Sequence, residues 1–158
     1  MTPDTFRRLL IALAFVLPFA VAGCQTANML TIPGVAASDS ADDILRRLRT
    51  SEGLTAMRVD PTLERAAKEQ ARLMAASGHM AHTTGRGDDF AARIRRNGIE
   101  GAAAENIARG NYDLERLFLA WMNSRGHRRN MMDARFTRFG LASAQAKDGQ
   151  RYWALVVA

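Results

Sequence analysis

Residues 121–130 read WMNSRGHRRN, from Trp121 to Asn130. The stretch sets one large aromatic residue before a single histidine that lies among three arginines. A solvated basic surface does not need the histidine, and arginine is almost never fully buried unless it is paired. We therefore expect Trp121 to anchor a helix in the core. We expect Gly126 to end this helix, so that His127 turns towards other polar groups while the arginines face solvent.

The sequence on either side of this stretch predicts a helix before it and a hairpin after it. The helix begins near Asp113 and turns its apolar residues inward. Two apolar, strand-like segments follow at 138–145 and 151–158, and Asp148 and Gly149 between them are a pair typical of a tight hairpin turn. The inward residues of the helix are Leu114, Leu117, Phe118 and Trp121.

Three more helices and a short strand are predicted before this stretch. Ser40 and Asp60 are typical N-cap residues, and Pro61 suits a first helical turn. Helices that enclose a small antiparallel sheet make an α+β sandwich, which is the predicted fold class. The ranges are Ser40–Gly53, Asp60–Ser77 and Asp89–Asn97 for the helices and Ala104–Ala108 for the strand.

Two short motifs carry polar residues that could meet His127. GHMAHTTG (78–85) contains His79 and His82, a pair that could chelate a metal ion or simply be exposed in a loop. AAAENIARG (102–110) places Glu105 among alanines. Burying an unpaired carboxylate is costly, so Glu105 lies either at a strand end that faces solvent or in a site that holds it.

Taken together, these motifs resemble the CAP superfamily, the SCP-like fold of cysteine-rich secretory proteins, antigen 5 and pathogenesis-related proteins. The similarity is greatest to its small bacterial branch and covers residues 40–158. It rests on the order of five motifs. These are MRVDPTLERAAKEQARLMAASG (57–78), His82, ENIARG (105–110), WMNSRGHRRN and a final strand that contains YW.

The resemblance implies a three-layer α-β-α sandwich with a shallow cleft, in which histidines and glutamates can hold a divalent metal. By position, the cleft residues are His82, Glu105 and His127. Ser124 stands where the family has a second glutamate, so the metal set is incomplete. We expect Zn²⁺ or another divalent cation to bind weakly to His82, Glu105 and His127, with His79 outside the cleft.

Two classes of function are compatible with such a cleft. The first is a binding module that holds a small or lipid-like ligand or a cell-wall fragment. The second is a hydrolase of peptides or esters that uses a metal or a histidine–glutamate pair. If His82, Glu105 and His127 all bound the metal, no general base would remain. Ser124 could act as a nucleophile with His127, but no glycine motif for an oxyanion hole accompanies it. Binding is therefore the preferred function.

The N-terminus has the features of an export signal. Arg7 and Arg8 precede an apolar run at 9–22 that is shorter than the roughly 20 residues needed to span a bilayer. Val21 to Cys24 resemble the lipobox of bacterial lipoproteins, which implies cleavage before Cys24 and diacylation of its thiol. An ordinary signal peptide with a coincidental cysteine is the alternative.

These features predict a lipoprotein of the bacterial cell envelope that faces the periplasm. Residues 1–23 are the expected signal peptide, 24–39 a flexible tether and 40–158 the folded domain. Gln25 after the lipidated position slightly favours the outer membrane over the inner membrane. The membrane is thus an expected partner, through the lipid on Cys24.

The formal net charge of +6 favours either an anionic partner or a solvated basic surface. The basic residues are scattered, and no fingerprint of a nucleic-acid-binding module is present, so we expect no nucleic-acid partner. Cys24 is the only cysteine, so no internal disulfide can form. We expect a monomer whose domain is held together by core packing.

Overall fold

The computed structural model describes residues 32–158. Its centre is a sheet in which neighbouring strands follow the order β1-β4-β5-β3, all antiparallel. A two-residue strand, β2, pairs in parallel with the start of β4. The strands are β1 (Gly34–Ala36), β2 (Arg58–Val59), β3 (Ala104–Arg109), β4 (Arg138–Gln145) and β5 (Arg151–Val157).

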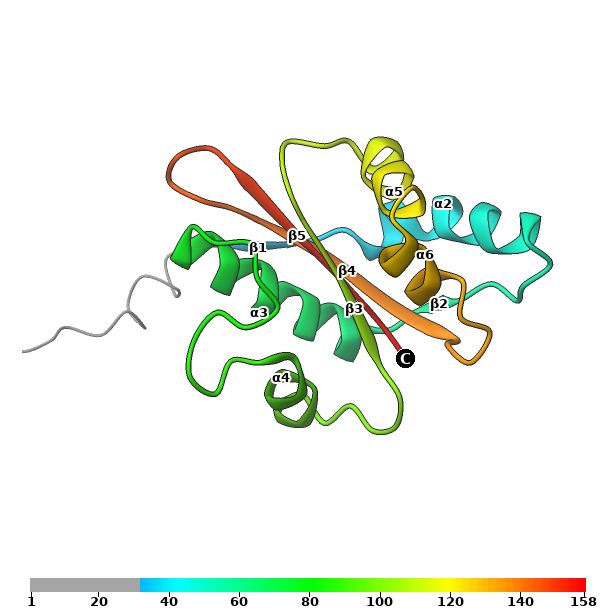
Figure 1. Ribbon diagram of the computed structural model, residues 1–158, viewed down its shortest axis with the longest axis horizontal. Coiled ribbons are helices and arrows are strands. Elements are labelled where there is room, and N and C mark those ends of the chain that lie inside the picture. Colours follow the sequence, from blue (N-terminus) through cyan, green and yellow to red (C-terminus); the bar gives the residue numbers. More distant parts are fainter. Residues whose placement is uncertain (1–31) are drawn as a thin grey trace, which may run out of the picture.

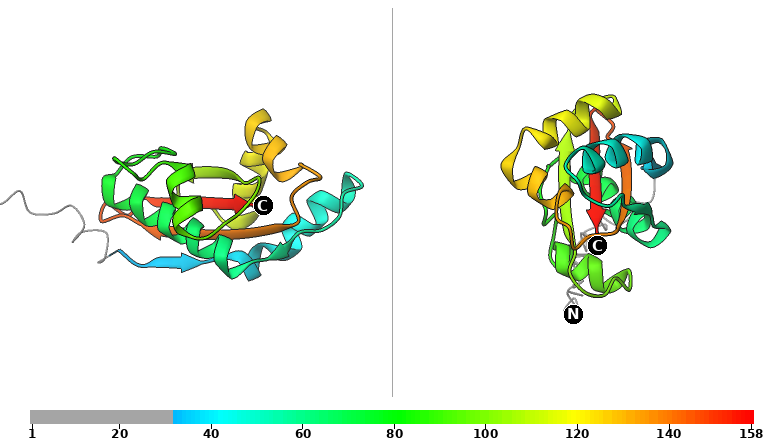
Figure 2. Two further views of the ribbon diagram at one scale, coloured as in Figure 1. Left: turned by 90° about the horizontal axis from the view of Figure 1, so that it is seen from below. Right: turned by 90° about the vertical axis from the view of Figure 1, so that its right-hand side faces the viewer.

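Helices cover both faces of this sheet (Figure 1, Figure 2). α3 and α4 pack on one face, and α2, α5 and α6 pack on the other. The prediction of an α+β, three-layer α-β-α sandwich is therefore confirmed. The helices are α2 (Ser38–Ser51), α3 (Pro61–Ser77), α4 (Phe90–Arg96), α5 (Leu114–Met122) and α6 (Arg125–Met131).

The two-residue period of the strands divides the core into two clusters, because successive side chains of a strand point to opposite faces. On β5, Tyr152, Ala154 and Val156 pack towards α3. Trp153, Leu155 and Val157 pack towards α2 and α5. Both clusters lie within residues 32–158, so this part of the chain carries its own core.

The start of α3 is the element that the sequence predicted most accurately. Asp60 is the N-cap and accepts from the amide of Thr62, with Pro61 in the first turn as expected. This turn packs directly on β4 at Gly140, where an added Cβ would lie 2.0 Å from the backbone nitrogen of Glu64. Gly140 is therefore required for the close approach of helix and strand.

The N-terminal boundary of the domain differs from the prediction. Ile32 is buried, and residues 34–36 form strand β1 beside β4, so the second half of the expected tether, residues 32–39, belongs to the fold. The helix expected to begin at Ser40 begins at Ser38. The buried Ser38 hydroxyl donates to Leu141 O (3.3 Å) and accepts from Leu141 N (2.9 Å), which fixes the helix start on β4. The predicted signal peptide (1–23) and Cys24 lie outside the described residues.

The predicted helix break at Gly126 is also wrong. Helix α5 ends at Met122, and Asn123 and Ser124 separate it from α6. Gly126 is the second residue of α6. His127 is therefore presented by a helix and not by a loop. Within residues 32–158, none of the helices combines the length and apolar character that a bilayer crossing requires.

A buried arginine holds the loops at one end of the molecule together. Arg49, at the end of α2, is 1% exposed and has no carboxylate within hydrogen-bonding distance. Its guanidinium donates only to backbone carbonyls, from the loop after α2 and from the segment between α6 and β4. Burial lowers the pKa of Arg49. The acceptors are Thr55 O (2.8 Å), Met131 O (2.6 Å), Asp133 O (3.1 Å) and Phe136 O (3.1 Å).

We expect Arg49→Met to lower the free energy of unfolding by about 3 kcal/mol or more, because several shielded carbonyls lose their only charged donor. Arg47→Met is the matched control. Arg47 forms an exposed ion pair with Glu115, and such pairs contribute about 1 kcal/mol or less. Urea unfolding of both variants measures the difference, and equal losses would show that Arg49 does not clamp these loops.

Candidate functional site

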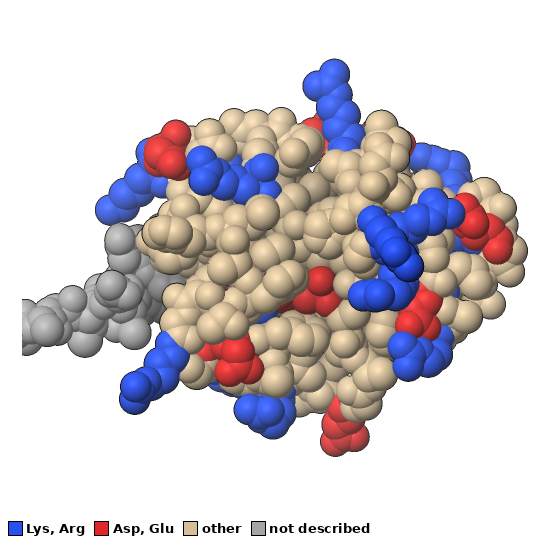
Figure 3. Space-filling model, viewed as in Figure 1, with Lys and Arg blue, Asp and Glu red and all other residues tan. Residues whose placement is uncertain are grey.

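Three of the predicted cleft residues come from three separate elements near the edge strand β3. His82 lies in the segment after α3, Glu105 is the second residue of β3, and His127 lies on α6. Figure 3 shows this face of the molecule hollowed at its centre, with an acidic side chain in the hollow and basic side chains over α6. The predicted meeting of His82 with Glu105 is present, since His82 Nδ1 lies 2.8 Å from Glu105 Oε1.

The carboxylate of Glu105 is held by an arginine that the sequence analysis did not single out. Arg93 Nη2 lies 2.8 Å from both carboxylate oxygens, and the two side chains are 1% and 2% exposed. Arg93 Nη1 donates to His82 O (3.0 Å) and Asp88 O (2.5 Å). The sequence does indicate that Arg93 faces inward, because it lies three residues after Phe90 and beside Ile94 on the buried side of α4.

The contact with Glu105 fixes the ring of His82. A carboxylate bound to Arg93 only accepts hydrogen bonds, so His82 Nδ1 carries the proton and donates it to Glu105. When the ring is neutral, Nε2 is then left as an acceptor. The His82 side chain is 54% exposed, so this nitrogen is accessible to a ligand.

His127 is half buried beside the indole of Trp121, with 6.4 Å between the ring centroids. Burial lowers the pKa of His127, and a positive charge on nearby His82, when that ring is protonated, lowers it further. Both effects favour the neutral form of the His127 ring.

The rest of the WMNSRGHRRN stretch binds α5 and α6 to the edge strand. Trp121 Nε1 donates to Ile107 O (3.2 Å), so the buried indole also gives a backbone carbonyl of the edge strand β3 a hydrogen-bond donor. Asn130 Nδ2 donates to Asn106 Oδ1 (2.9 Å), and Asn106 Nδ2 donates to His127 O (3.1 Å). These side-chain bonds position the helix that carries His127.

Two further residues that the sequence suggested for the site, Ser124 and His79, take no part in these contacts. Ser124 is the N-cap residue of α6, and its side chain makes no capping hydrogen bond. Its part in ligand binding stays a prediction. His79 is exposed, and its Nδ1 lies 2.7 Å from Ser77 O at the end of α3.

The arrangement does not fit a metal held by His82, Glu105 and His127. Both oxygens of Glu105 are engaged by Arg93, whose buried positive charge lies where it would repel a cation. Among residues 32–158, no three His, Cys, Asp or Glu side chains converge closely enough to hold a metal ion. Weak Zn²⁺ binding by this trio stays a prediction, and it requires Arg93 to release Glu105.

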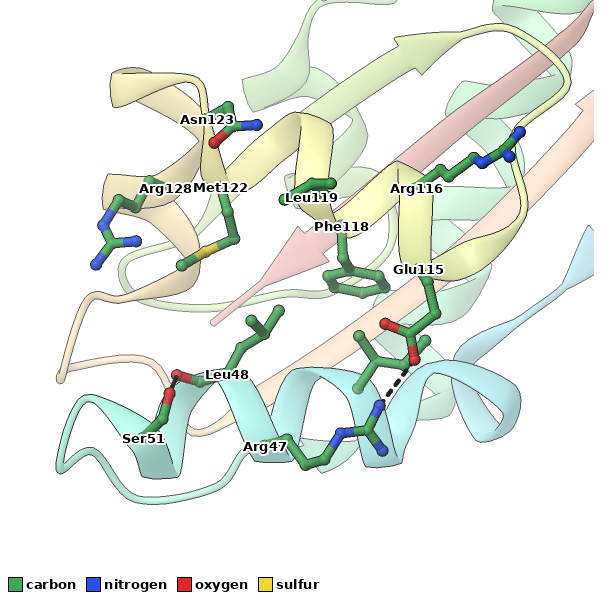
Figure 4. Close-up of a pocket in the computed structure, with 11 residues that line it drawn as sticks. Arg47, Leu48, Ser51, Glu115, Arg116, Phe118, Leu119, Met122, Asn123 and Arg128 are labelled. Atoms are coloured by element: carbon green, nitrogen blue, oxygen red, sulfur yellow. Dashed lines mark hydrogen bonds and ion pairs between the residues drawn. The ribbon is translucent and has the colours of Figure 1, made fainter.

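A separate apolar groove lies between α2 and α5, with a volume of about 650 Å³ (Figure 4). Phe118 and Leu48 point into it from the two helices, and Leu119, at its side, is 60% exposed. Arg128 of α6 lies at one end and the Arg47–Glu115 ion pair at the other. The remaining lining residues are Ile44, Ser51, Arg116, Met122 and Asn123.

The fold and its edge-strand site define a small α-β-α sandwich with a histidine–glutamate pair beside β3. A family model described as the cysteine-rich secretory protein family (CAP) matches residues 43–157. The chain belongs to this family, which confirms the resemblance found in the motifs.

A sequence relative and several solved structures are similar to the chain. The uncharacterized protein YkwD of Bacillus subtilis (strain 168) is 30% identical over 99 residues, which are 62% of this chain and 38% of the relative. The chain thus spans about two fifths of that relative's length.

Three solved structures, each under 25% identical, show the fold alone. An outer surface protein from Borrelia burgdorferi has a TM-score of 0.67 and 22% identity, over 75% of this chain and 89% of that one. An extracellular SCP-domain protein from Bacillus anthracis has a TM-score of 0.64 and 22% identity, over 75% and 39%. A cysteine-rich secretory protein from Staphylococcus aureus has a TM-score of 0.58 and 18% identity, over 86% and 39%.

We expect Arg93→Met to bind zinc more tightly than the unsubstituted protein, because the substitution frees Glu105 and removes the buried positive charge. Zinc should also raise the melting temperature of this variant, because the buried Glu105 carboxylate without Arg93 otherwise destabilises the fold by several kcal/mol. Calorimetric titration and thermal melts with and without zinc measure both effects.

Two variants control this zinc experiment. Arg95→Met removes an exposed arginine from the same helix and should behave like the unsubstituted protein. Arg93→Met combined with Glu105→Gln should lose the zinc effect. If the unsubstituted protein binds zinc as tightly as Arg93→Met, Arg93 does not block the site.

Proposed function

We propose that the protein is a ligand-binding domain of the cell envelope, and that its ligand is a lipid-like molecule with an acyl chain in the α2–α5 groove. The groove carries this proposal. Its volume of about 650 Å³ lies within the range of small-molecule sites, and apolar side chains from two helices line it. Leu119 in particular leaves a large apolar surface exposed that an acyl chain would cover.

The rim of the groove favours an anionic head group. Three arginines and one glutamate are among the lining residues. Arg47 pairs with Glu115 (2.8 Å) and Arg128 with Glu52 (2.6 Å), but all four side chains are more than 40% exposed. Exposed ion pairs contribute about 1 kcal/mol or less, so either arginine can exchange its partner for a phosphate or carboxylate.

The histidine cleft is the second candidate site, for a polar ligand such as a cell-wall fragment. The accessible Nε2 of His82 favours this, because a sugar hydroxyl or an amide can donate to it. Catalysis is less well supported. The carboxylate of Glu105 is held by Arg93 and His82, so it is not available as a metal ligand or as a general base. The hydrolase hypothesis then depends on the two histidines, His82 and His127.

The proposed location is the bacterial envelope, with the chain anchored through a lipid on Cys24. The lipobox-like residues before Cys24 support the anchor. Two of the similar structures are named as an outer surface protein and an extracellular protein, which agrees with a location outside the cytoplasm.

We expect Leu119→Asp to weaken binding of a fluorescent long-chain fatty acid at least tenfold, because a charge would then lie against the acyl chain. The residue is exposed, so the fold should be unaffected. Titration of the fatty acid measured by fluorescence gives the dissociation constants.

Met80→Asp is the matched control for this titration. It adds the same charge at a methionine that is 50% exposed and lies outside the groove. Its affinity should equal that of the unsubstituted protein. If both aspartate variants bind equally well, or if the unsubstituted protein binds no fatty acid, the groove is not the site.

The anchor is tested separately. Cys24→Ser removes the thiol that would be acylated, so the protein should leave the membrane fraction and lose the mass of the acyl groups. Cell fractionation and mass spectrometry of the mature N-terminus measure both. An unchanged N-terminal mass would exclude the lipoprotein proposal.

A further inference from the structure

Three basic residues lie at the end of the sheet that holds the β4–β5 turn. Lys147 is in the turn, Arg151 is the first residue of β5, and Arg109 is the last residue of β3. The backbone places Arg109 beside Arg151, because Arg109 pairs with Tyr152 and the amide of Gly110 donates to Arg151 O (2.8 Å). We call these three residues the basic end, and basic side chains stand out from this end in Figure 3.

The charges of the basic end are not neutralised within residues 32–158. Arg109 and Lys147 are exposed, and none of the three has an acidic partner among the described residues. The guanidinium of Arg151 lies 5.5 Å from the ring of Trp153, which leaves its charge intact. Asp148 is the acid in this turn, and its carboxylate accepts from the amide of Gln150 (3.0 Å).

Exposed apolar side chains accompany these charges. Val35 of β1 is 57% exposed and pairs with Ser143, two residues before the end of β4. Met80 is 50% exposed and follows the end of α3, which lies at the same end of the molecule as the β4–β5 turn (Figure 1, Figure 2). Together with Leu119 in the groove, these are the large apolar residues that stand exposed in the described part of the chain.

We propose that the basic end, with Val35 and Met80, binds the surface of an anionic membrane. Basic side chains attract anionic head groups, and neighbouring apolar side chains can enter the interface below them. The inference rests on the envelope location in the proposed function. It agrees with the position of the proposed anchor, since Gly34 follows Cys24 by ten positions in the sequence. Such a segment spans at most about 35 Å, so it would keep this end near the bilayer.

This contact would orient the domain. Glu105 lies at the opposite end of β3 from Arg109, about 13 Å away along the strand. With the basic end on the membrane, the Glu105 end of β3 points away from the bilayer, and His82, two residues after Met80, lies between the two. The cleft is then accessible to polar ligands from the aqueous side.

Binding to vesicles tests the proposal. The chain from residue 24 onward, with Cys24→Ser, keeps both core clusters and lacks the acylated thiol. We expect it to sediment with vesicles of phosphatidylglycerol and phosphatidylcholine, less so at high salt, and not with phosphatidylcholine alone. Each basic residue near the surface raises binding about fivefold, so changing Arg109, Lys147 and Arg151 to glutamine should lower it roughly a hundredfold.

The control changes Arg58, Arg125 and Arg129 to glutamine. It removes the same charge from β2 and α6, away from the β4–β5 turn, and all three residues are exposed. This variant should lose much less binding than the first. Equal losses would show that only net charge matters, and no sedimentation with anionic vesicles would also overturn the proposal.

A second pair of substitutions separates a membrane from a soluble polyanion. Val35→Ser with Met80→Ser should weaken binding to vesicles and leave binding to heparin unchanged. If these substitutions have no effect on vesicle binding, the surface recognises negative charge alone and the membrane proposal fails. Fatty-acid binding in the groove serves as the folding control for all variants. If the unsubstituted protein binds no fatty acid, that result counts against the proposed function only.

Discussion

The buried ion pair between Arg93 and Glu105 is the interaction on which the rest of the site depends. Taking both charges out of water costs several kcal/mol per ion, and only complete hydrogen bonding offsets such a cost. The protein meets this requirement. Arg93 donates to both oxygens of Glu105 and to two carbonyls, and His82 supplies a further donor. One pair thereby joins α4, the edge strand β3 and the segment that carries His82.

A second buried arginine holds the opposite side of the cleft by a different means. Arg49 is compensated by carbonyl dipoles, including that of Met131 at the end of α6, where the helix dipole favours a positive charge. Arg49 thus holds the helix of His127 as Arg93 holds the loop of His82. Without disulfides in the described domain, these two guanidiniums connect loops that core packing alone would leave free to move.

Local patterns predicted those elements whose signals are themselves local. The Asp60 cap and the Asp148–Gly149 turn each depend on neighbouring residues, and both were predicted correctly. The sequence did not predict β1, because a strand of three residues is too short to show an alternation of apolar and polar side chains. A glycine favours a helix end, but Gly126 lies inside α6. The role of Arg93 depends on a carboxylate twelve residues away on another element, and an arginine-rich helix by itself indicates only a solvated surface.

The proposed groove and the histidine cleft share helix α6, since Arg128 faces the first and His127 the second. A ligand in the groove can affect the cleft only through a difference in contacts between bound and free states. A ligand in the groove could change the exposed ion pair between Arg128 and Glu52. This pair contributes about 1 kcal/mol or less to stability. At that magnitude the affinity of the cleft changes about fivefold at most. The bonds of Asn106 and Asn130 meanwhile hold α6 on β3. Two nearly independent sites on one small domain are therefore the arrangement that these contacts favour.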